Sequence, residues 1–280
     1  MAGLRKVNTV VISDVHLGTY GCQAKALLCY LKSIDPQRII LNGDIIDIWQ
    51  FNKRYWPKSH MKIIKHLMKW IVAGKQVYYI TGNHDEMLRK FKNYQIGNFS
   101  IVNKLVVDLD GEKAWFFHGD IFDVTMRYSK WLTRLGGMGY DALILLNSCI
   151  NWLLIKMGKS RMSFSKTIKN SVKSAVKYIN QFEQVAVDIA AQNGYKYVVC
   201  GHIHQPNMET FTVDGKSVVY LNSGDWIENL SALEYHQGQW KIIYYDQLFG
   251  ADVVTTEIED IKNSKELFED MLLEFNMMKN

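Results

Sequence analysis

The sequence predicts an α/β fold that is interrupted by a helical insertion. Over the first 120 residues, short runs rich in β-branched residues alternate with amphipathic segments. Residues 121–194 contain no convincing strand, and strands return as hairpins from Tyr195 onward. Strands that alternate with helices at this spacing indicate a parallel sheet buried on both faces. The chain therefore divides into an α/β core and a helical insertion at approximately residues 121–194.

The first half of the chain supplies three predicted strands, with helices between them, and then a hairpin. The strands are residues 8–13, 38–42 and 76–81, and the helices are residues 23–33 and 59–73, the second ending at Gly74. Residues 105–108 and 113–117 flank Asp110-Gly111, a dipeptide that favours a two-residue hairpin turn.

The second half begins with the insertion, which is broken by the glycine-rich residues 136–139, and then returns to strands. A strand at residues 196–200 precedes two hairpins, residues 210–221 around Asp214-Gly215 and residues 232–245 around HQGQ. Residues 264–278 have the pattern of an amphipathic helix with Ser264 as its N-cap.

Composition and charge exclude several classes of protein. The 280 residues are 48% hydrophobic and 22% charged, which excludes a disordered chain. The four cysteines form no CxxC pair, and no signal peptide is recognisable, so we expect reduced thiols and a cytoplasmic protein. The longest apolar stretch, residues 142–157, is shorter than the roughly 20 residues of a membrane span and is interrupted by asparagines.

Five short polar motifs stand at or just after predicted strand ends. They are Asp14-Val15-His16, Gly43-Asp44, Gly82-Asn83-His84-Asp85, His118-Gly119-Asp120 and Gly201-His202-Ile203-His204. Open α/β sheets place ligand sites at the carboxyl ends of their strands, where loops converge. One such motif alone is a weak signal, because an isolated histidine is more often structural, but five at successive strand ends indicate one functional site.

The residue types in these motifs suit divalent metal ions. Imidazole nitrogens and carboxylate oxygens bind Mn, Fe, Co and Zn, and the absence of cysteine from the motifs excludes a thiolate zinc site. Seven candidate ligands exceed the needs of one ion. A carboxylate can bridge two ions about 3.5–4 Å apart, the arrangement that activates water for phosphate-ester hydrolysis. We therefore expect two divalent ions, with Mn²⁺ preferred.

The motif order DxH…GD…GNHD…HG…GHxH, over residues 14–204, resembles the calcineurin-like metallophosphoesterase superfamily. The resemblance implies a single domain over residues 1–280, a two-sheet sandwich flanked by helices, here with a helical lid insertion. It implies that one ion is held by Asp14, His16, Asp44 and His204, and the other by Asp44, Asn83, His118 and His202. His84 would face the phosphate and the leaving oxygen with Asp85 orienting it, so that Asn83, His84 and Asp85 are the catalytic candidates.

Within this superfamily the chain resembles the group that contains UDP-2,3-diacylglucosamine diphosphatase of bacterial lipid A synthesis. The similar segments are SDVHLGT at 13–19, GDIIDIW at 43–49 and NSGDWIEN at 222–229, together with a helical insertion after HGD. One position departs from the group. Its diphosphatases often carry Arg in the GNxD motif, where this chain has His84. This difference leaves the identity of the substrate open, but it does not affect the prediction of phosphoester hydrolysis.

The insertion adds a clue of its own, because residues 121–180 hold ten basic residues and only two acidic ones. Basic and apolar helices suit an anionic lipid surface or a lid over acyl chains. The substrate-binding candidates are Arg127, Trp131, Trp152, Lys156 and Arg161, with Asn222 and Asp225, which either orient a histidine or line the pocket. Alternatively, the apolar residues of the insertion only pack it onto the core. Nucleic acid is the less favoured partner, because the aromatic residues are not interleaved with basic ones.

The sequence thus predicts a metal-dependent hydrolase of UDP-2,3-diacylglucosamine. It leaves open whether the protein also makes peripheral contact with the inner membrane. The alternatives are a phosphodiesterase or phosphatase acting on another nucleotide or lipid phosphate, a nuclease, and a non-catalytic interaction module. Asp47 supports the site or only caps local structure, and we expect ordinary structural roles for His60, His66 and His236, which lie outside every motif.

Overall fold

The computed structural model describes residues 4–49, 55–122 and 165–250. By its contacts the chain divides into two compact units, one formed by residues 1–119 and 186–280 and the other by residues 120–185. The first unit holds every metal-ligand candidate of the sequence.

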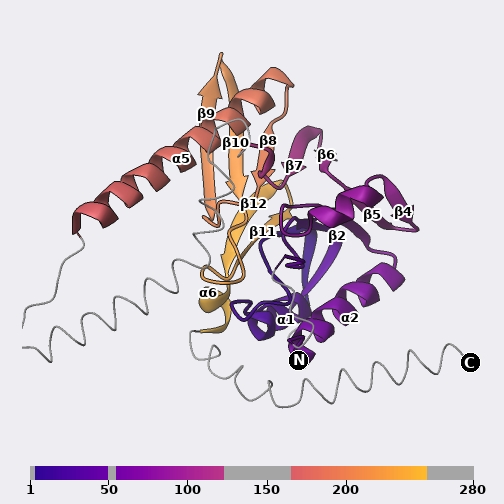
Figure 1. The fold of residues 1–280 in the computed structure, drawn as a ribbon. Coiled ribbons are helices and arrows are strands. Elements are labelled where there is room, and N and C mark those ends of the chain that lie inside the picture. Colours follow the sequence, from indigo (N-terminus) through magenta and orange to yellow (C-terminus); the bar gives the residue numbers. More distant parts are fainter. Residues whose placement is uncertain (1–3, 50–54, 123–164, 251–280) are drawn as a thin grey trace, which may run out of the picture. The chain divides into compact units, whose positions relative to one another are not determined.

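The first unit contains two mixed sheets (Figure 1). The larger has the order β12-β11-β1-β2-β3-β5-β4, with β1 (Arg5–Ile12), β2 (Ile34–Asn42), β3 (Gln76–Ile80), β4 (Tyr94–Ile96), β5 (Phe99–Val102), β11 (Ser231–His236) and β12 (Gln239–Tyr244). The smaller has the order β6-β7-β8-β10-β9, with β6 (Lys104–Leu109), β7 (Glu112–Phe117), β8 (Tyr197–Cys200), β9 (Asn207–Val213) and β10 (Lys216–Asn222). The predicted parallel pairing is confirmed for β1, β2 and β3, which are neighbours in register.

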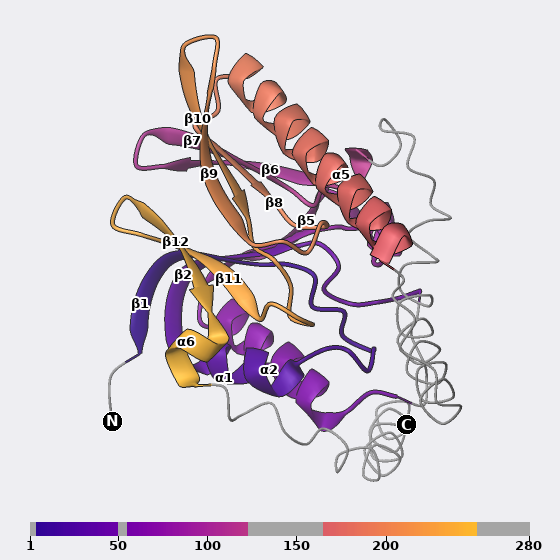
Figure 2. The same ribbon diagram turned by 90° about the vertical axis from the view of Figure 1, so that its left-hand side faces the viewer.

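The two sheets lie as separate layers in Figure 2 and share a core. Alternation along the strands builds that core, because successive side chains point to opposite faces. Val11 and Ile40 face the smaller sheet, whereas Val10 and Ile39 belong to the cluster on the other face. The predicted two-sheet sandwich is therefore confirmed.

Helices cover the outer face of the larger sheet. α1 (Ala24–Lys32) and α2 (Lys58–Val72) pack there, α2 through a stripe of Ile63, Leu67 and Trp70. The amide of Gly74, at φ 82°, donates to the carbonyl of Ile71, and the helix ends there as predicted. A short 3₁₀ helix, η1 (Glu86–Phe91), follows β3, and α6 (Tyr245–Phe249) follows β12.

Three two-residue turns close the hairpins β6–β7, β9–β10 and β11–β12. Their central pairs, Asp110-Gly111, Asp214-Gly215 and Gln237-Gly238, all have positive φ. This conformation matches the twist of the strands, and it confirms the predicted hairpins. The sequence did not predict β4 and β5, which are 3 and 4 residues long.

The second unit is described only in part. Within it the rings of Phe122 and Phe182 lie 5.4 Å apart, and α5 (Ser165–Gln192) runs from this unit into the first. Residues 123–164 and the predicted helix at 264–278 lie outside the described residues, so the helical lid stays a prediction. Among the described helices, none is both long enough and apolar enough to span a membrane.

Candidate metal centre

Loops at the carboxyl ends of strands from both sheets meet at the candidate site. Asp14 and His16 follow β1, Asp44 follows β2, Asn83 and His84 follow β3, His118 follows β7, and His202 and His204 follow β8. Hydrogen bonds from backbone amides join these loops. The amide of Asp14 donates to the carbonyl of Gly43 at 3.1 Å, and the amide of His202 donates to the side-chain oxygen Asp14 Oδ2 at 3.1 Å.

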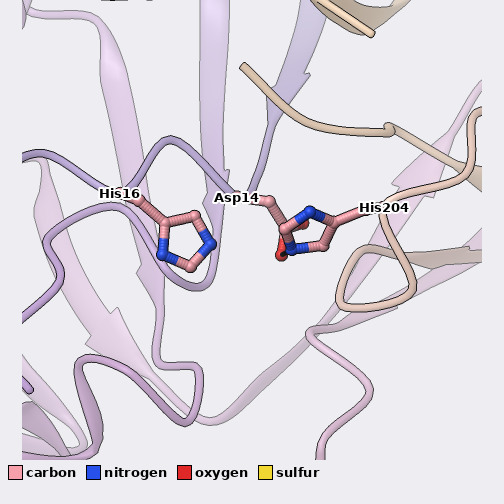
Figure 3. A group of neighbouring side chains, drawn as sticks. All are labelled: Asp14, His16 and His204. Atoms are coloured by element: carbon pink, nitrogen blue, oxygen red, sulfur yellow. Dashed lines mark ion pairs between the residues drawn. The ribbon is translucent and has the colours of Figure 1, made fainter. Parts of the chain in front are cut away.

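The candidate ligands gather into three overlapping groups. Within each group one ligand atom per residue lies within 4.8 Å of the others, and the groups are Asp14–His16–His204, His16–Asp44–His84 and Asp44–His118–His202. Figure 3 shows the first, with His204 beside Asp14 and the ring of His16 next to them. These groups contain the six predicted ligands that are histidines or aspartates. They also contain His84, which was not predicted as a ligand, and Asp44 lies in two of them.

The backbone of these loops is left-handed at five of the candidate ligands. Asp14, His16, Asp44, His202 and His204 have φ between 51° and 68°. Such angles are uncommon outside glycine, and at several neighbouring positions they mark a site where tertiary structure overrides local preference.

Close approach explains one of the motif glycines. A Cβ atom at Gly82 would overlap both Asp44 and the ring of His118. The glycine therefore leaves the space in which a carboxylate from one sheet meets a histidine from the other.

Buried polar atoms without partners test whether metal ions fit here. His16 Nε2 and Asn83 Oδ1 are buried and make no hydrogen bond within the part of the chain that the structure describes. A buried donor or acceptor left unpaired is costly, and an ion beside it removes that cost. Asp14 and Asp44 are 0% and 2% exposed, which is rare for carboxylates without a cation. The residues present therefore fit divalent ions.

The two carboxylates remain ionised in this environment. Burial alone would raise the pKa of Asp14, but His204, whose Nε2 lies 3.2 Å from Asp14 Oδ1, lowers it to about 2. Burial likewise disfavours the charge on Asp44, yet His118 at 3.2 Å holds the pKa of that carboxyl well below its usual range. Both groups are therefore anionic at neutral pH, as cation binding requires.

Asp47 supports the site directly. Its Oδ2 lies 2.8 Å from His84 Nδ1 and 3.2 Å from His16 Nδ1, and its side chain is 2% exposed. A carboxylate on Nδ1 fixes the orientation of an imidazole and leaves Nε2 for the centre. Of the two roles left open for Asp47, the structure favours support of the site.

The contacts of Asp85 lie in the loops and not at the ring of His84. Its oxygens accept hydrogen bonds from the amides of Ile45 and Gly82 and from the hydroxyl of Tyr79. These bonds fix the loops after β2 and β3, whereas the contact with the His84 ring belongs to Asp47. The sequence suggested the adjacent carboxylate because it could not show which carboxylate the fold brings to the ring.

Backbone and carboxylate groups also orient the other histidines. His118 Nδ1 donates to the carbonyl of Asn42 at 2.9 Å, which directs Nε2 toward Asp44. His204 Nδ1 lies 3.8 Å from Asp225 Oδ2. These contacts are typical of metal-binding histidines, whose second nitrogen is held by a carbonyl or carboxylate.

Asn222 and Asp225 are both buried. Asn222 donates to the carbonyl of Gly201 at 2.9 Å, and Asp225 Oδ1 accepts from the amides of Ile227, Glu228 and Asn229. They hold the loops around His204, so of their two predicted roles the geometry favours orientation over lining a pocket. The other substrate-binding candidates, Arg127, Trp131, Trp152, Lys156 and Arg161, lie outside the described residues.

One neighbour of the site was not singled out from the sequence. The ring of Trp49 lies 4.9 Å from that of His84 and is 43% exposed. Its only signal was its place two residues after Asp47 in GDIIDIW.

Comparisons with known proteins identify the family of this chain. A family model described as calcineurin-like phosphoesterase matches residues 7–206. A protein of Aeromonas salmonicida (strain A449) named UDP-2,3-diacylglucosamine hydrolase is 26% identical over 248 residues, covering 84% of this chain and 92% of its own. One of the same name from Aliivibrio fischeri (strain MJ11) is 22% identical, covering 80% and 92%. Among solved structures, the phosphoesterase Yfce from E. coli is similar with a TM-score of 0.43 at 13% identity, covering 85% of this chain and 93% of that one.

Proposed function

This chain belongs to the calcineurin-like phosphoesterase family and is a metal-dependent phosphoesterase, and we propose that its substrate is UDP-2,3-diacylglucosamine. Water would break the diphosphate bridge at phosphorus to give UMP and 2,3-diacylglucosamine 1-phosphate. The observation that carries a dimetal hydrolase is the set of three overlapping, largely buried groups of candidate ligands, two of which contain Asp44.

The residues would hold two divalent ions, for which we propose Mn²⁺, with Fe, Co or Zn as alternatives. Asp14, His16, Asp44 and His204 would hold one, and Asp44, Asn83, His118 and His202 the other. When bound, such ions lower the pKa of water and offset the negative charge of the phosphate.

His84 is the candidate to contact the phosphate. Burial would lower the pKa of its imidazole, but the neighbouring carboxylates of Asp47 and Asp44 raise it. A ring held by Asp47 on Nδ1 can offer a proton from Nε2 to the phosphate or the leaving oxygen. The amide group of Asn83 would lie beside the same phosphate, and Asp85 would hold the loop that carries Asn83 and His84.

Three observations support the lipid-linked nucleotide as substrate. The two relatives of that name described above align over at least 80% of this chain. The segments at 13–19, 43–49 and 222–229 are similar to that group. The basic and apolar insertion suits acyl chains and phosphate, with Arg127, Trp131, Trp152, Lys156 and Arg161 as proposed contacts, and peripheral contact with the inner membrane would follow.

The test is release of UMP from UDP-2,3-diacylglucosamine by the purified protein with Mn²⁺. Asp44→Ala is the matched control, because it removes the carboxylate common to both ligand groups. UMP release by the wild type and not by the variant is the expected result. No release by a preparation that hydrolyses bis(p-nitrophenyl) phosphate would exclude this substrate.

A second candidate is a phosphodiesterase or phosphatase acting on another nucleotide or lipid phosphate. The observation that favours it is His84, which stands where the diphosphatases of the group often carry arginine. Turnover of other phosphodiesters at rates well above that of the lipid-linked nucleotide would select this alternative.

A further inference from the structure

The segment that follows the GNHD motif exposes apolar side chains. Met87, Phe91, Tyr94 and Ile96 are 55%, 50%, 59% and 66% exposed. The rings of Phe91 and Tyr94 lie 6.3 Å apart in an edge-to-face arrangement, so these two side chains form a continuous apolar surface. Large contiguous apolar surface on a folded protein usually marks an interaction site.

The same segment is basic. Arg89, Lys90 and Lys92 stand among the apolar residues, and Glu86 is the one acidic residue between positions 86 and 97. The neighbouring α2 covers the same face of the larger sheet, because Leu88 and Leu67 pack against one core cluster. The exposed residues of α2 include Lys62, Lys65, Met68, Lys69 and Val72.

We propose that residues 86–97, together with the exposed residues of α2, form a surface that docks on an anionic lipid membrane. Aromatic and aliphatic side chains would enter the boundary between headgroups and acyl chains, and the surrounding basic groups would meet anionic headgroups. Apolar side chains interspersed with lysine and arginine match that boundary in both polarity and charge.

A protein strand fits this surface less well. β4 stands at the edge of the larger sheet, but it is only 3 residues long and offers few backbone groups for strand addition. The biological purpose of this docking rests on the proposed lipid-linked substrate, whereas the docking surface itself is inferred independently of it. The surface begins two residues after His84, so docking would bring the metal centre close to a substrate held in the membrane.

Sedimentation with vesicles tests the proposal on the full chain. The wild type should bind phosphatidylcholine vesicles that contain phosphatidylglycerol, and should bind them less as salt rises. The triple variant Phe91→Ser/Tyr94→Ser/Ile96→Ser should bind at least about tenfold more weakly, because the apolar anchors are lost. The matched control Val106→Ser/Met208→Ser changes side chains that are 44% and 45% exposed on the smaller sheet, and it should bind as the wild type does.

Charge-reversal variants give a second test of the proposal. Lys90→Glu/Lys92→Glu should weaken binding to the anionic vesicles, and Lys104→Glu/Lys113→Glu, on exposed positions of β6 and β7, should not. All four variants should hydrolyse bis(p-nitrophenyl) phosphate as the wild type does, which separates loss of docking from loss of the site.

Four results of the vesicle experiment would overturn the proposal. They are absence of wild-type binding to anionic vesicles, unchanged binding of the triple variant, equal losses in variant and control, and equal binding to neutral vesicles. A wild-type dimer that the triple variant converts to a monomer would also overturn it, by showing that a second copy covers this surface.

Discussion

Left-handed backbone occurs at both ends of the strands, in the hairpin turns at one end and in the candidate metal centre at the other. At the turns, Asp110, Asp214 and Gln237 are exposed, and each precedes a glycine that shares the conformation. In the metal centre, Asp14 and Asp44 take the same angle while almost fully buried. The same dihedral angle therefore has two origins.

The difference lies in what maintains the conformation. At a two-residue turn, the local sequence and the twist of two paired strands suffice. At the metal centre, hydrogen bonds between loops hold it, such as those from the amides of Val15 and His16 to the carbonyl of Asp44. Strain that distant segments must maintain is typical of functional sites, since no local preference would retain it.

The largest expected effect comes from the shared carboxylate. Asp44→Ala should lower hydrolysis of bis(p-nitrophenyl) phosphate by at least about 10²–10³-fold and remove bound metal, because both ligand groups lose a member. Asp214→Ala changes an exposed aspartate of the same left-handed conformation and should leave both unchanged. Metal analysis and steady-state kinetics check this, and full metal content in Asp44→Ala would contradict it.

Glycine substitutions at the two ends sharpen the comparison. Gly82→Ala should lower kcat/KM by about 10²-fold, because the new methyl group displaces Asp44 and His118. Gly215→Ala meets nothing within 4 Å and bears only the strain of φ 75°, so it should cost about 1 kcal/mol of unfolding free energy and retain activity. Urea denaturation and kinetics on both variants distinguish these outcomes. Equal activity losses would mean that packing does not explain Gly82.

Asp47→Asn tests a residue that supports the site without belonging to the ligand groups. We expect kcat/KM to fall by about 10–100-fold, because His84 and His16 lose the carboxylate on Nδ1. Since Asp47 raises the pKa of His84, its loss should move the limb of the pH–rate profile that reports His84 to lower pH. Asp35→Asn, whose carboxylate pairs with Lys75 on another part of the larger sheet, is the control. An unshifted pH–rate profile would show that Asp47 does not raise the pKa of His84.

The smallest effect on hydrolysis is expected from His60, which supports the loop after β1 from outside the site. His60 is fully buried, accepts a hydrogen bond from the amide of Gly18 at 3.0 Å, and has its pKa lowered by burial to about 4. Because the unfolded chain binds a proton near pH 6.5 and the folded one does not, the stabilisation is present above pH 6.5. It is lost as pH falls toward 4, by about 3 kcal/mol in total.

His60→Asn should flatten that part of the pH dependence, because it keeps an acceptor for Gly18 and removes the titrating group. Unfolding free energies between pH 4 and 7 are the measurement. A slope equal to that of the wild type would show that His60 is not the group responsible.

The comparison also explains what the sequence could predict. The turns Asp110-Gly111 and Asp214-Gly215 were predictable because a dipeptide determines them. The strands β1, β2 and β3 were predictable from apolar β-branched runs, and the ligands followed from polar residues at the strand ends. β4 and β5 were missed because strands of 3 and 4 residues show no clear alternation.

Contacts between segments that are distant in the sequence could not be predicted from it. Asp85 is adjacent to His84 in the sequence and Asp47 is not, and only the folded chain shows that Asp47 reaches the ring. Likewise, nothing local distinguishes an Asp225 that lines a pocket from one that holds a loop by three amides. Such roles depend on distances between segments that the sequence alone does not contain.

The candidate ligands come from both sheets, with Asp44 from the larger and His118 and His202 from the smaller. An ion in that group would act as a cross-link between the two layers. Opening of either layer at this end would have to release the ion, so chelation should lower the unfolding temperature and speed amide exchange in the loops there. The hairpin turns at the far end should exchange as before, which would make metal occupancy a determinant of how the sandwich comes apart.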